Sequence, residues 1–312
     1  LKAALASREA LFDDHCYRWV YGDSDGLPGL VIDRFGDVIV VQVSNAGIEL
    51  LLEALLAAIN ELLPELNVLL KNDGKMRAIE GLDEYVRVAQ GDVPKLVPLK
   101  ENGVSFLVPV WDGQKTGWFY DHRLNRRRVQ KLSAGKRVLD IFSYIGGWGI
   151  QAAAAGAKEV VCVDASASAL DLVHQQAQLN GVADKVHSLK GDAFAAMKQL
   201  HEDGERFDMV IIDPPAFIAR RKDIKAGELA YQRANQLAMR LLTPEGILVS
   251  ASCSMHLERT RLTQLLQEAC RKNGRNGQVL EQGGQGGDHP IHPAIPETDY
   301  LKSVILRTWY ED

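Results

Sequence analysis

From residue 136 onward, short apolar runs alternate with amphipathic helical segments, and this alternation limits the possible folds more than any other feature of the chain. An apolar run bounded by turn residues predicts a strand that is buried on both faces. Strands that alternate with helices form a parallel sheet covered by helices. We therefore predict a doubly wound, Rossmann-like α/β domain with strands at Val138–Phe142, Val160–Asp164, Val186–Lys190, Phe207–Asp213, Gly246–Ala251 and Lys302–Tyr310.

The residues before this domain predict a smaller α+β unit. Leu30–Arg34 and Val38–Val43 have the composition of strands, and a helical stretch through Leu63 separates them from further short strands near 67–71 and 85–89. The prolines and glycine of Gln90–Pro98 indicate a boundary. We place a linker helix and an EEHEE-like accessory or RNA-binding domain at residues 1–95, and the Rossmann-like domain at residues 96–312.

Two short segments follow neighbouring strands of the larger domain. Asp213-Pro214-Pro215 comes after the fourth strand, and Ser252-Cys253-Ser254 comes after the fifth. Ligands of open α/β sheets bind outside the carboxyl ends of the strands. We therefore expect a carboxylate, a rigid turn and a thiol to surround one site, which indicates covalent chemistry on a flat ring.

Acidic and glycine residues follow the first three strands. Glycines let the loop after the first strand approach a ligand closely, and an acid at the end of the second strand accepts hydrogen bonds from ribose hydroxyls. Gly147–Ala152 also fits the dinucleotide pattern G-x-G-x-x-A, but a nicotinamide enzyme needs neither an acid after strand three nor Asp-Pro-Pro after strand four. The ordered set is instead typical of class I S-adenosylmethionine (SAM) methyltransferases. We take as SAM-binding residues Asp140, Phe142, Gly146, Gly147, Asp164, Asp192, Ala193, Asp213 and Pro214.

Cys253 is the candidate nucleophile. Carbon 5 of a pyrimidine becomes nucleophilic only after a thiolate has added to carbon 6, which is nucleophilic covalent catalysis. Asp213 would hold the ring near nitrogen 3 and stabilise the charge that develops. Asp-Pro-Pro-aromatic turns usually serve the methylation of amino groups, but here Ala216 follows Pro215, and only Phe217 is left as an aromatic ring that could stack on the base.

Composition narrows the class of protein. The net charge of −5 argues against a generic nucleic-acid binder, but two basic clusters flank the expected site and favour a polyanionic substrate. The four cysteines are widely spaced, so we expect neither disulfides nor a metal site, and reduced thiols indicate the cytoplasm. No apolar stretch is long enough to span a membrane. The basic residues expected to bind RNA are Arg126, Arg127, Arg128, Arg220, Arg221 and Lys222.

At these residues the chain resembles a family of bacterial 23S rRNA methyltransferases that join a PUA domain, a small α+β domain and a class I SAM domain. The closest members make 5-methylcytosine. The resemblance implies that Cys253 is the nucleophile, that Gln114, Thr116 and Arg123 line the SAM site, that large-subunit rRNA is the substrate, and that a PUA domain is expected before Leu1. The matching segments are 18–30, 113–123, 142–147, 213–217, 252–254 and 288–290.

Two alternatives stay open at this point. Relatives with the same Gln-Lys-Thr-Gly and Asp-Pro-Pro features methylate guanine nitrogen 7, in which case Cys253 would be structural. A non-catalytic RNA-binding assembly factor that retains SAM is the second alternative, although an intact set of acids and glycines argues against it. The sequence identifies neither the base that removes the carbon-5 proton nor the target nucleotide, and it leaves both a monomer and a homodimer open.

Overall fold

The computed structural model describes residues 1–310 and contains two compact units. The first consists of residues 1–123 and 285–298, and the second of residues 124–284 and the segment from 299 onward. The expected boundary at residues 95 and 96 falls inside the first unit, because the chain from 96 to 123 is bonded to its sheet. The Lys71 ammonium, for example, donates to the carbonyls of Trp111 (2.9 Å) and Gly113 (2.7 Å).

The second unit contains a seven-stranded sheet in the order β10-β9-β8-β11-β12-β14-β13. The first five strands in this order pair in parallel, and β14 is antiparallel to both of its neighbours. The fold class predicted from the sequence is therefore confirmed, with one reversed strand. The strands are β8 (Arg137–Ile141), β9 (Glu159–Asp164), β10 (Val186–Lys190), β11 (Phe207–Ile212), β12 (Leu242–Ser252), β13 (Arg275–Gly283) and β14 (Lys302–Tyr310).

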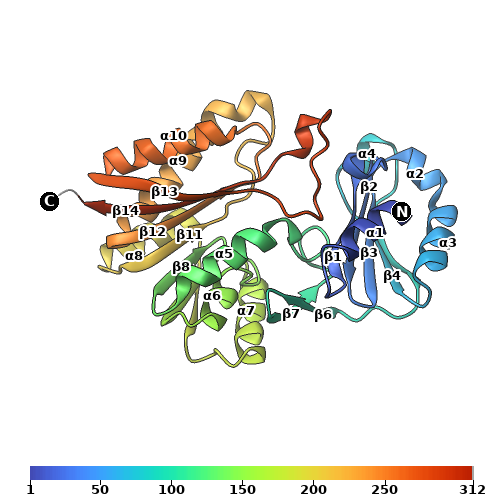
Figure 1. Ribbon diagram of the computed structural model, residues 1–312, viewed down its shortest axis with the longest axis horizontal. Helices are drawn as coiled ribbons and strands as arrows, with labels where there is room; N and C mark the ends of the chain where they lie inside the picture. The colour runs from blue at the N-terminus through green and yellow to red at the C-terminus, as the bar shows by residue number, and fades with distance from the viewer. Residues whose placement is uncertain (311–312) are drawn as a thin grey trace. The chain divides into compact units, whose positions relative to one another are not determined.

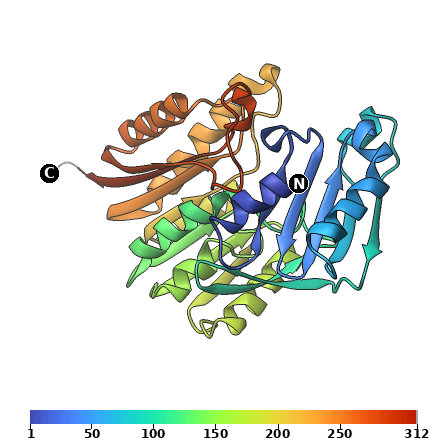
Figure 2. The same cartoon turned by 45° about the vertical axis from the view of Figure 1, so that its right-hand side comes forward.

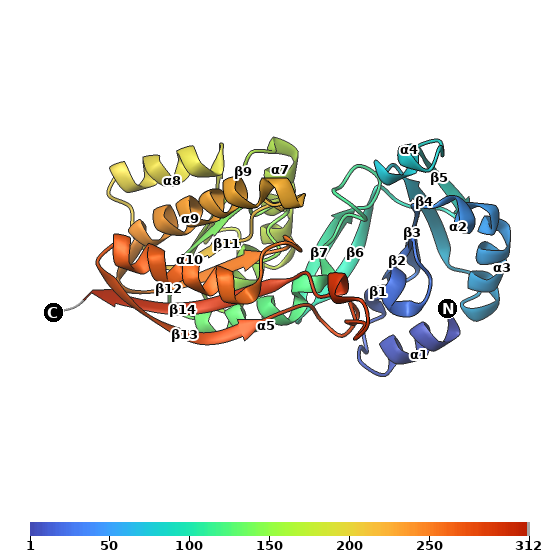
Figure 3. The ribbon, with the colours of Figure 1, turned by 90° about the horizontal axis from the view of Figure 1, so that it is seen from above.

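Helices cover both faces of this sheet (Figures 1 and 3). Helices α8, α9 and α10 lie on one face, where Met197, Ala238 and Leu266 join a core that includes Ile141 and Val210 of the sheet. Helices α5, α6 and α7 lie on the other face. The helices are α5 (Arg123–Ser133), α6 (Gly149–Ala154), α7 (Ala167–Leu179), α8 (Ala193–Glu202), α9 (Ile224–Arg240) and α10 (Arg259–Lys272).

The strand order of the second unit locates its ligand-binding edge. From β8 the chain proceeds outward through β9 to β10, and then returns to place β11 on the other side of β8. Such a reversal is the topological switch point at which open α/β sheets bind ligands. The loops after β8 and β11 leave the sheet at this point.

The first unit is built on a five-stranded sheet in the order β1-β2-β3-β4-β5 (Figure 2). Ala4 of α1 and Ile59 of α3 pack in the same core as Trp19 and Ile32, so both helices cover one face. A separate hairpin, β6–β7, follows the sheet. The elements are α1 (Lys2–Glu9), β1 (Cys16–Tyr21), β2 (Leu30–Phe35), β3 (Val38–Val43), α2 (Ala46–Leu50), α3 (Leu52–Leu62), β4 (Asn67–Asn72), α4 (Met76–Ile79), β5 (Tyr85–Gln90), β6 (Leu96–Glu101) and β7 (Val104–Pro109).

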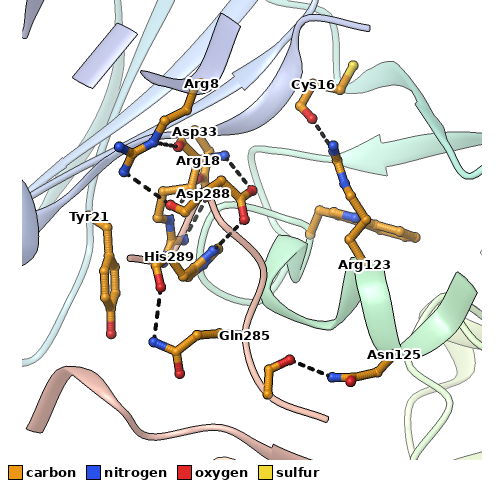
Figure 4. Close-up of polar contacts among 12 residues, drawn as sticks. Arg8, Cys16, Arg18, Tyr21, Asp33, Arg123, Asn125, Gln285, Asp288 and His289 are labelled. Carbon is orange, nitrogen blue, oxygen red and sulfur yellow. Dashed lines mark hydrogen bonds and ion pairs between the residues drawn. The ribbon is translucent and has the colours of Figure 1, made fainter. Parts of the chain in front are cut away.

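Residues 285–298 belong to the first unit although they lie between β13 and β14 in the sequence. Asp288 makes the connection (Figure 4): its Oδ2 accepts from the Arg18 amide at 3.1 Å, and its carbonyl accepts from Arg8 at 3.2 Å. Its Oδ1 lies 3.0 Å from Nδ1 of His289. The Asp-His-Pro segment noted in the sequence therefore holds a returning loop against β1.

Within residues 1–310, no helix is both long enough and apolar enough to cross a membrane.

Candidate active site

The loop after β8 takes an unusual backbone path. Phe142 and Tyr144 have positive φ values of 65° and 49°, and Gly146 has a φ of 84°. Residues other than glycine are uncommon in this region, and such strain gathers at ligand-binding sites. At Gly149, a Cβ atom would lie 2.7 Å from the Cys162 sulfur, so only glycine lets α6 begin this close to the sheet.

Asp140 anchors this loop from the end of β8. Its Oδ2 accepts from the Gly149 amide at 2.9 Å, whereas its Oδ1 has no protein partner although the residue is fully buried. Burial, together with the carboxylates of Asp213 and Asp164, raises the pKa of Asp140 to about 8. The buried Ser143 hydroxyl likewise has no protein partner. Two buried polar atoms without protein partners thus lie in one loop, which suits a polar ligand there.

The acids after β9 and β10 already bind backbone amides. Asp164 accepts from the amides of Tyr144 and Ser166, both at 2.9 Å. Asp192 caps the amino terminus of α8 by accepting from the Ala195 amide at 3.0 Å. A carboxylate has about four acceptor sites, so both residues can accept further hydrogen bonds.

The Asp-Pro-Pro turn follows β11, beside the loop after β8. Oδ2 of Asp213 accepts from the Trp148 indole at 3.0 Å. Pro214 is buried, whereas Pro215 and Ala216 are exposed. Trp148 therefore orients the Asp213 carboxylate, and the apolar side of the turn is held in the protein.

Hydrogen bonds join the Asp-Pro-Pro segment to the Ser-Cys-Ser segment. The Ser254 hydroxyl accepts from the Ile218 amide at 3.1 Å and lies 2.9 Å from the Tyr231 hydroxyl. Ser252 donates to the same Tyr231 hydroxyl at 2.8 Å and accepts from the Ser254 amide at 3.1 Å. The two segments that the sequence placed near each other are thus bonded through buried groups.

Cys253 lies between these two serines. It is half-buried, whereas Cys16, Cys162 and Cys270 are buried. Burial raises the pKa of each of the other three thiols. Cys253 is therefore the most accessible thiol of the described chain, and its backbone is held on both sides.

Phe217 packs against other aromatic rings. Its ring centroid lies 4.8 Å from that of Tyr231, 6.1 Å from Phe194 and 6.2 Å from Phe142. This half-buried ring helps to join the loops after β8, β10 and β11. Much of its surface is thus already used in packing.

Gln114, Thr116 and Arg123 belong to the first unit. The Thr116 hydroxyl donates to Asp33 at 2.5 Å, and the Arg123 guanidinium donates to the Cys16 carbonyl. Both side chains are buried. They stabilise the first unit, and the assignment of all three residues to the SAM site stays a prediction.

The predicted RNA-binding residues differ in exposure. Arg126 is only 3% exposed, and its charge lowers the pKa of Asp140, although burial has the larger, opposite effect. Arg127 is exposed, and Arg128 forms an ion pair with Glu281. The second cluster is exposed: Arg220, Arg221 and Lys222.

Three residues at this site were missed by the sequence reasoning. Trp148 and Tyr231 hold Asp213 and the two serines, and neither has a signature in the local sequence. The ammonium of Lys302 donates to the Ser254 carbonyl at 2.6 Å. This residue could have been identified from the sequence. It is a charged residue next to the apolar run Val304–Leu306 of a buried strand, where burial of a charge requires a partner.

Comparison with known proteins agrees with this geometry. The sequence profile of the family described as S-adenosylmethionine-dependent methyltransferase matches residues 83–285. The ribosomal RNA large subunit methyltransferase I of Aeromonas salmonicida is 40% identical over 98% of this chain and 79% of its own length. The protein of the same name from Erwinia tasmaniensis is 38% identical over 98% of this chain and 77% of its own.

Solved structures share the fold. The crystal structure of SMU.776 complexed with SAH superimposes with a TM-score of 0.85 at 22% identity, covering 98% of this chain and 78% of that one. At this identity the likeness is evidence for the fold alone. The sequence profile and the curated relatives carry the assignment: the chain belongs to the S-adenosylmethionine-dependent methyltransferase family.

Proposed function

We propose that this enzyme methylates carbon 5 of a cytosine in large-subunit rRNA through a covalent bond between Cys253 and carbon 6 of the base. The observation that carries the proposal is the position of Cys253, the half-buried thiol whose neighbours Ser252 and Ser254 are bonded to Tyr231 and Ile218 beside the Asp-Pro-Pro turn. The curated relatives, named as large-subunit rRNA methyltransferases, support the choice of substrate.

The residues of the second unit suit the cofactor. When bound, SAM supplies an electrophilic methyl group. Asp164 and Asp192, each with acceptor capacity left, would receive hydrogen bonds from the ribose and the adenine. Asp140 and Phe142 would shape the loop in which Gly146 and Gly147 let the backbone approach the ligand, while Ala193, Asp213 and Pro214 would line the rest. The resemblance noted in the sequence also assigns Gln114, Thr116 and Arg123 to SAM binding.

In the proposed reaction the Cys253 thiolate forms a bond from Sγ to carbon 6 of cytosine. The electron pair of the 5,6 double bond then resides on carbon 5 and the ring, and the Asp213 carboxyl, when it carries a proton, would stabilise this charge by donating to nitrogen 3. Carbon 5 takes the methyl group, with S-adenosylhomocysteine as the leaving group. A base then removes the proton from carbon 5, and the bond between Sγ and carbon 6 breaks to restore the double bond and the thiolate.

The RNA would be held by exposed cations. Arg127, Arg128 and the cluster Arg220–Lys222 are accessible to phosphates. Arg126 is buried, so it would influence the RNA through its charge rather than through direct contact with a phosphate. Because a stacked base cannot reach a thiol, the cytosine must be extruded or already unpaired.

The test compares Cys253→Ser with Cys270→Ser, which changes a buried thiol in α10. Modified bases in rRNA methylated by each purified protein are mapped by mass spectrometry. We expect 5-methylcytosine from the wild type and from Cys270→Ser, and none from Cys253→Ser. RNA containing 5-fluorocytosine should trap a covalent adduct with the wild type and with Cys270→Ser, but not with Cys253→Ser.

Unchanged product from Cys253→Ser would disprove the covalent mechanism. A 7-methylguanine product that does not depend on Cys253 would establish the guanine alternative. If SAM binds but no base is modified, the assembly-factor alternative would hold.

A further inference from the structure

A buried lysine lies beside the Ser-Cys-Ser segment. In the antiparallel pairing of β12 with β14, Lys302 is directly opposite Ser252, one residue before Cys253. Its side chain is 4% exposed, and its ammonium donates to the carbonyls of Ser254 (2.6 Å) and Tyr300 (2.7 Å). An ammonium has three donors, so one remains after these two bonds.

The structural role of Lys302 alone does not explain its charge. A buried ammonium loses its hydration, and two neutral carbonyls are a weaker environment for it than a counter-ion. Lysine is rarely fully buried unless it is paired. The ionisable groups whose charges influence it are Cys253, Asp299 and Arg259.

These groups act on Lys302 in opposite directions. The pKa of Lys302 is lowered to about 8, mainly by burial. The thiolate form of Cys253 and the carboxylate of Asp299 oppose this shift, and the guanidinium of Arg259 adds to it. Interaction between two titrating sites is reciprocal. If a thiolate at Cys253 stabilises the ammonium, the ammonium stabilises the thiolate by the same free energy.

We propose that Lys302 is a positioning residue that holds Cys253 as a thiolate in the free enzyme. The Cys253 thiol gives its proton to water while Lys302 stays an ammonium, which leaves a thiolate beside a cation and needs no other reactant. The carbonyls of Ser254 and Tyr300 favour this pair, because hydrogen bonds from a charged donor are stronger than those from a neutral amine. The inference rests on the proposed function for its purpose, but its chemistry concerns the protein without RNA.

The pH range of the pair follows from the lysine. Near neutral pH, Lys302 is mostly protonated and can stabilise the thiolate. As the pH rises above about 8, the ammonium is lost and with it the electrostatic support of the sulfur. Lys302 thus increases the thiolate fraction of Cys253 most at pH values at which a free thiol, with a pKa of about 8.5, would be mostly protonated.

The experiment measures alkylation of Cys253 by iodoacetamide as a function of pH in the full chain without RNA. The buried Cys16, Cys162 and Cys270 react slowly in the folded protein, and Cys253→Ser supplies the background rate. Lys302→Met removes the charge and keeps an unbranched side chain that is one heavy atom shorter. An opposite charge nearby shifts a pKa by about 1–3 units, so we expect the midpoint of alkylation to rise by about one unit or more in Lys302→Met.

Lys272→Met is the matched control. Lys272 is exposed at the far end of α10, thirteen residues from Arg259 and therefore about 20 Å along the helix from the charges near Lys302. We expect its alkylation midpoint to equal that of the wild type. Lys302→Arg, which keeps a cation, should restore most of the shift.

Equal midpoints in the wild type and Lys302→Met would overturn the proposal. If Lys302→Met does not fold, Cys253→Ser gives the reciprocal measurement, because the 13C resonance of the Lys302 ε-carbon then reports the lysine pKa by NMR. The proposal requires this pKa to fall when the thiolate is lost, and an unchanged value refutes it. The proposed function is tested separately. The 5-methylcytosine product can be absent while the alkylation midpoint still shifts, and the product can form without any shift of the midpoint.

Discussion

Ser254→Ala tests the hydrogen bonds that join the two segments of the active site. The substitution removes one hydroxyl, and with it the acceptor of the buried Ile218 amide and one partner of the Tyr231 hydroxyl. Tyr231 keeps its bond with Ser252. The backbone carbonyl of Ser254, which accepts from Lys302, is chemically unchanged.

The expected cost follows from these two losses. A buried amide without an acceptor costs about 1–3 kcal/mol, and the lost bond with Tyr231 adds about 1 kcal/mol. Ser254→Ala should therefore lower the free energy of unfolding by about 2–4 kcal/mol. Ser250→Ala is the control: Ser250 lies on β12, the strand that leads to Ser254, is fully buried and has a hydroxyl without a hydrogen-bond partner, so its removal should change stability by less than about 1 kcal/mol.

Urea unfolding of both variants measures the difference, and the rate of methyl transfer at saturating RNA measures its consequence for the site. We expect Ser254→Ala to lose methyl transfer at least tenfold at a temperature where it stays folded. A double-mutant cycle with Tyr231→Phe should give a coupling energy of about 0.5–3 kcal/mol, since the two hydroxyls are in contact. Equal stabilities of Ser254→Ala and Ser250→Ala would refute the reasoning.

Three further outcomes follow from other contacts. Burial raises the pKa of Asp140 to about 8, so its carboxyl is mostly protonated at pH 7. A neutral Asn at this position keeps an acceptor for the Gly149 amide, whereas Ala leaves that amide unpaired at a cost of about 1–3 kcal/mol. Asp140→Asn should therefore be more stable than Asp140→Ala. Measured from pH 5 to pH 8, the stability of the wild type relative to Asp140→Asn should fall, because the folded state binds the proton more tightly than the unfolded state. Gly149→Ala should destabilise by about 1–3 kcal/mol because its Cβ meets the Cys162 sulfur, whereas Gly74→Ala, with open space around it, should not. Arg127→Glu should weaken RNA binding and reduce the slope of log affinity against log salt, and an unchanged slope in filter binding would remove Arg127 from the RNA surface.

Much of the larger unit was predictable because buried parallel strands are nearly continuous apolar runs. Strand β13 was missed, since its residues are mostly exposed at the edge of the sheet and carry no apolar pattern. Helix α8 was missed as well, and the reversed direction of β14 was not foreseen. In the first unit, β1 and the β6–β7 hairpin were not predicted.

The residues of the candidate site differ in how much of their position and environment the sequence predicted. The position of Asp140, Asp164, Asp192 and Asp213 at the carboxyl ends of strands follows from periodicity alone, because these ends share one edge of a parallel sheet. The burial of Arg126 did not follow, since a run of three arginines has the same composition whether it is exposed or not. The same limit applies to Thr116 and Arg123, whose partners lie about 80 to 110 residues away along the chain.

The sequence by itself therefore determined the class of the fold, the family, and the candidate carboxylates and thiol, because these depend on local patterns and short motifs. Only the tertiary structure decided which groups act on them. Trp148 reaches Asp213 across 65 residues, and Lys302 reaches Ser254 across 48. The physical reason is that charge, burial and hydrogen bonding at the site are set by neighbours in space, which a chain read in order does not reveal.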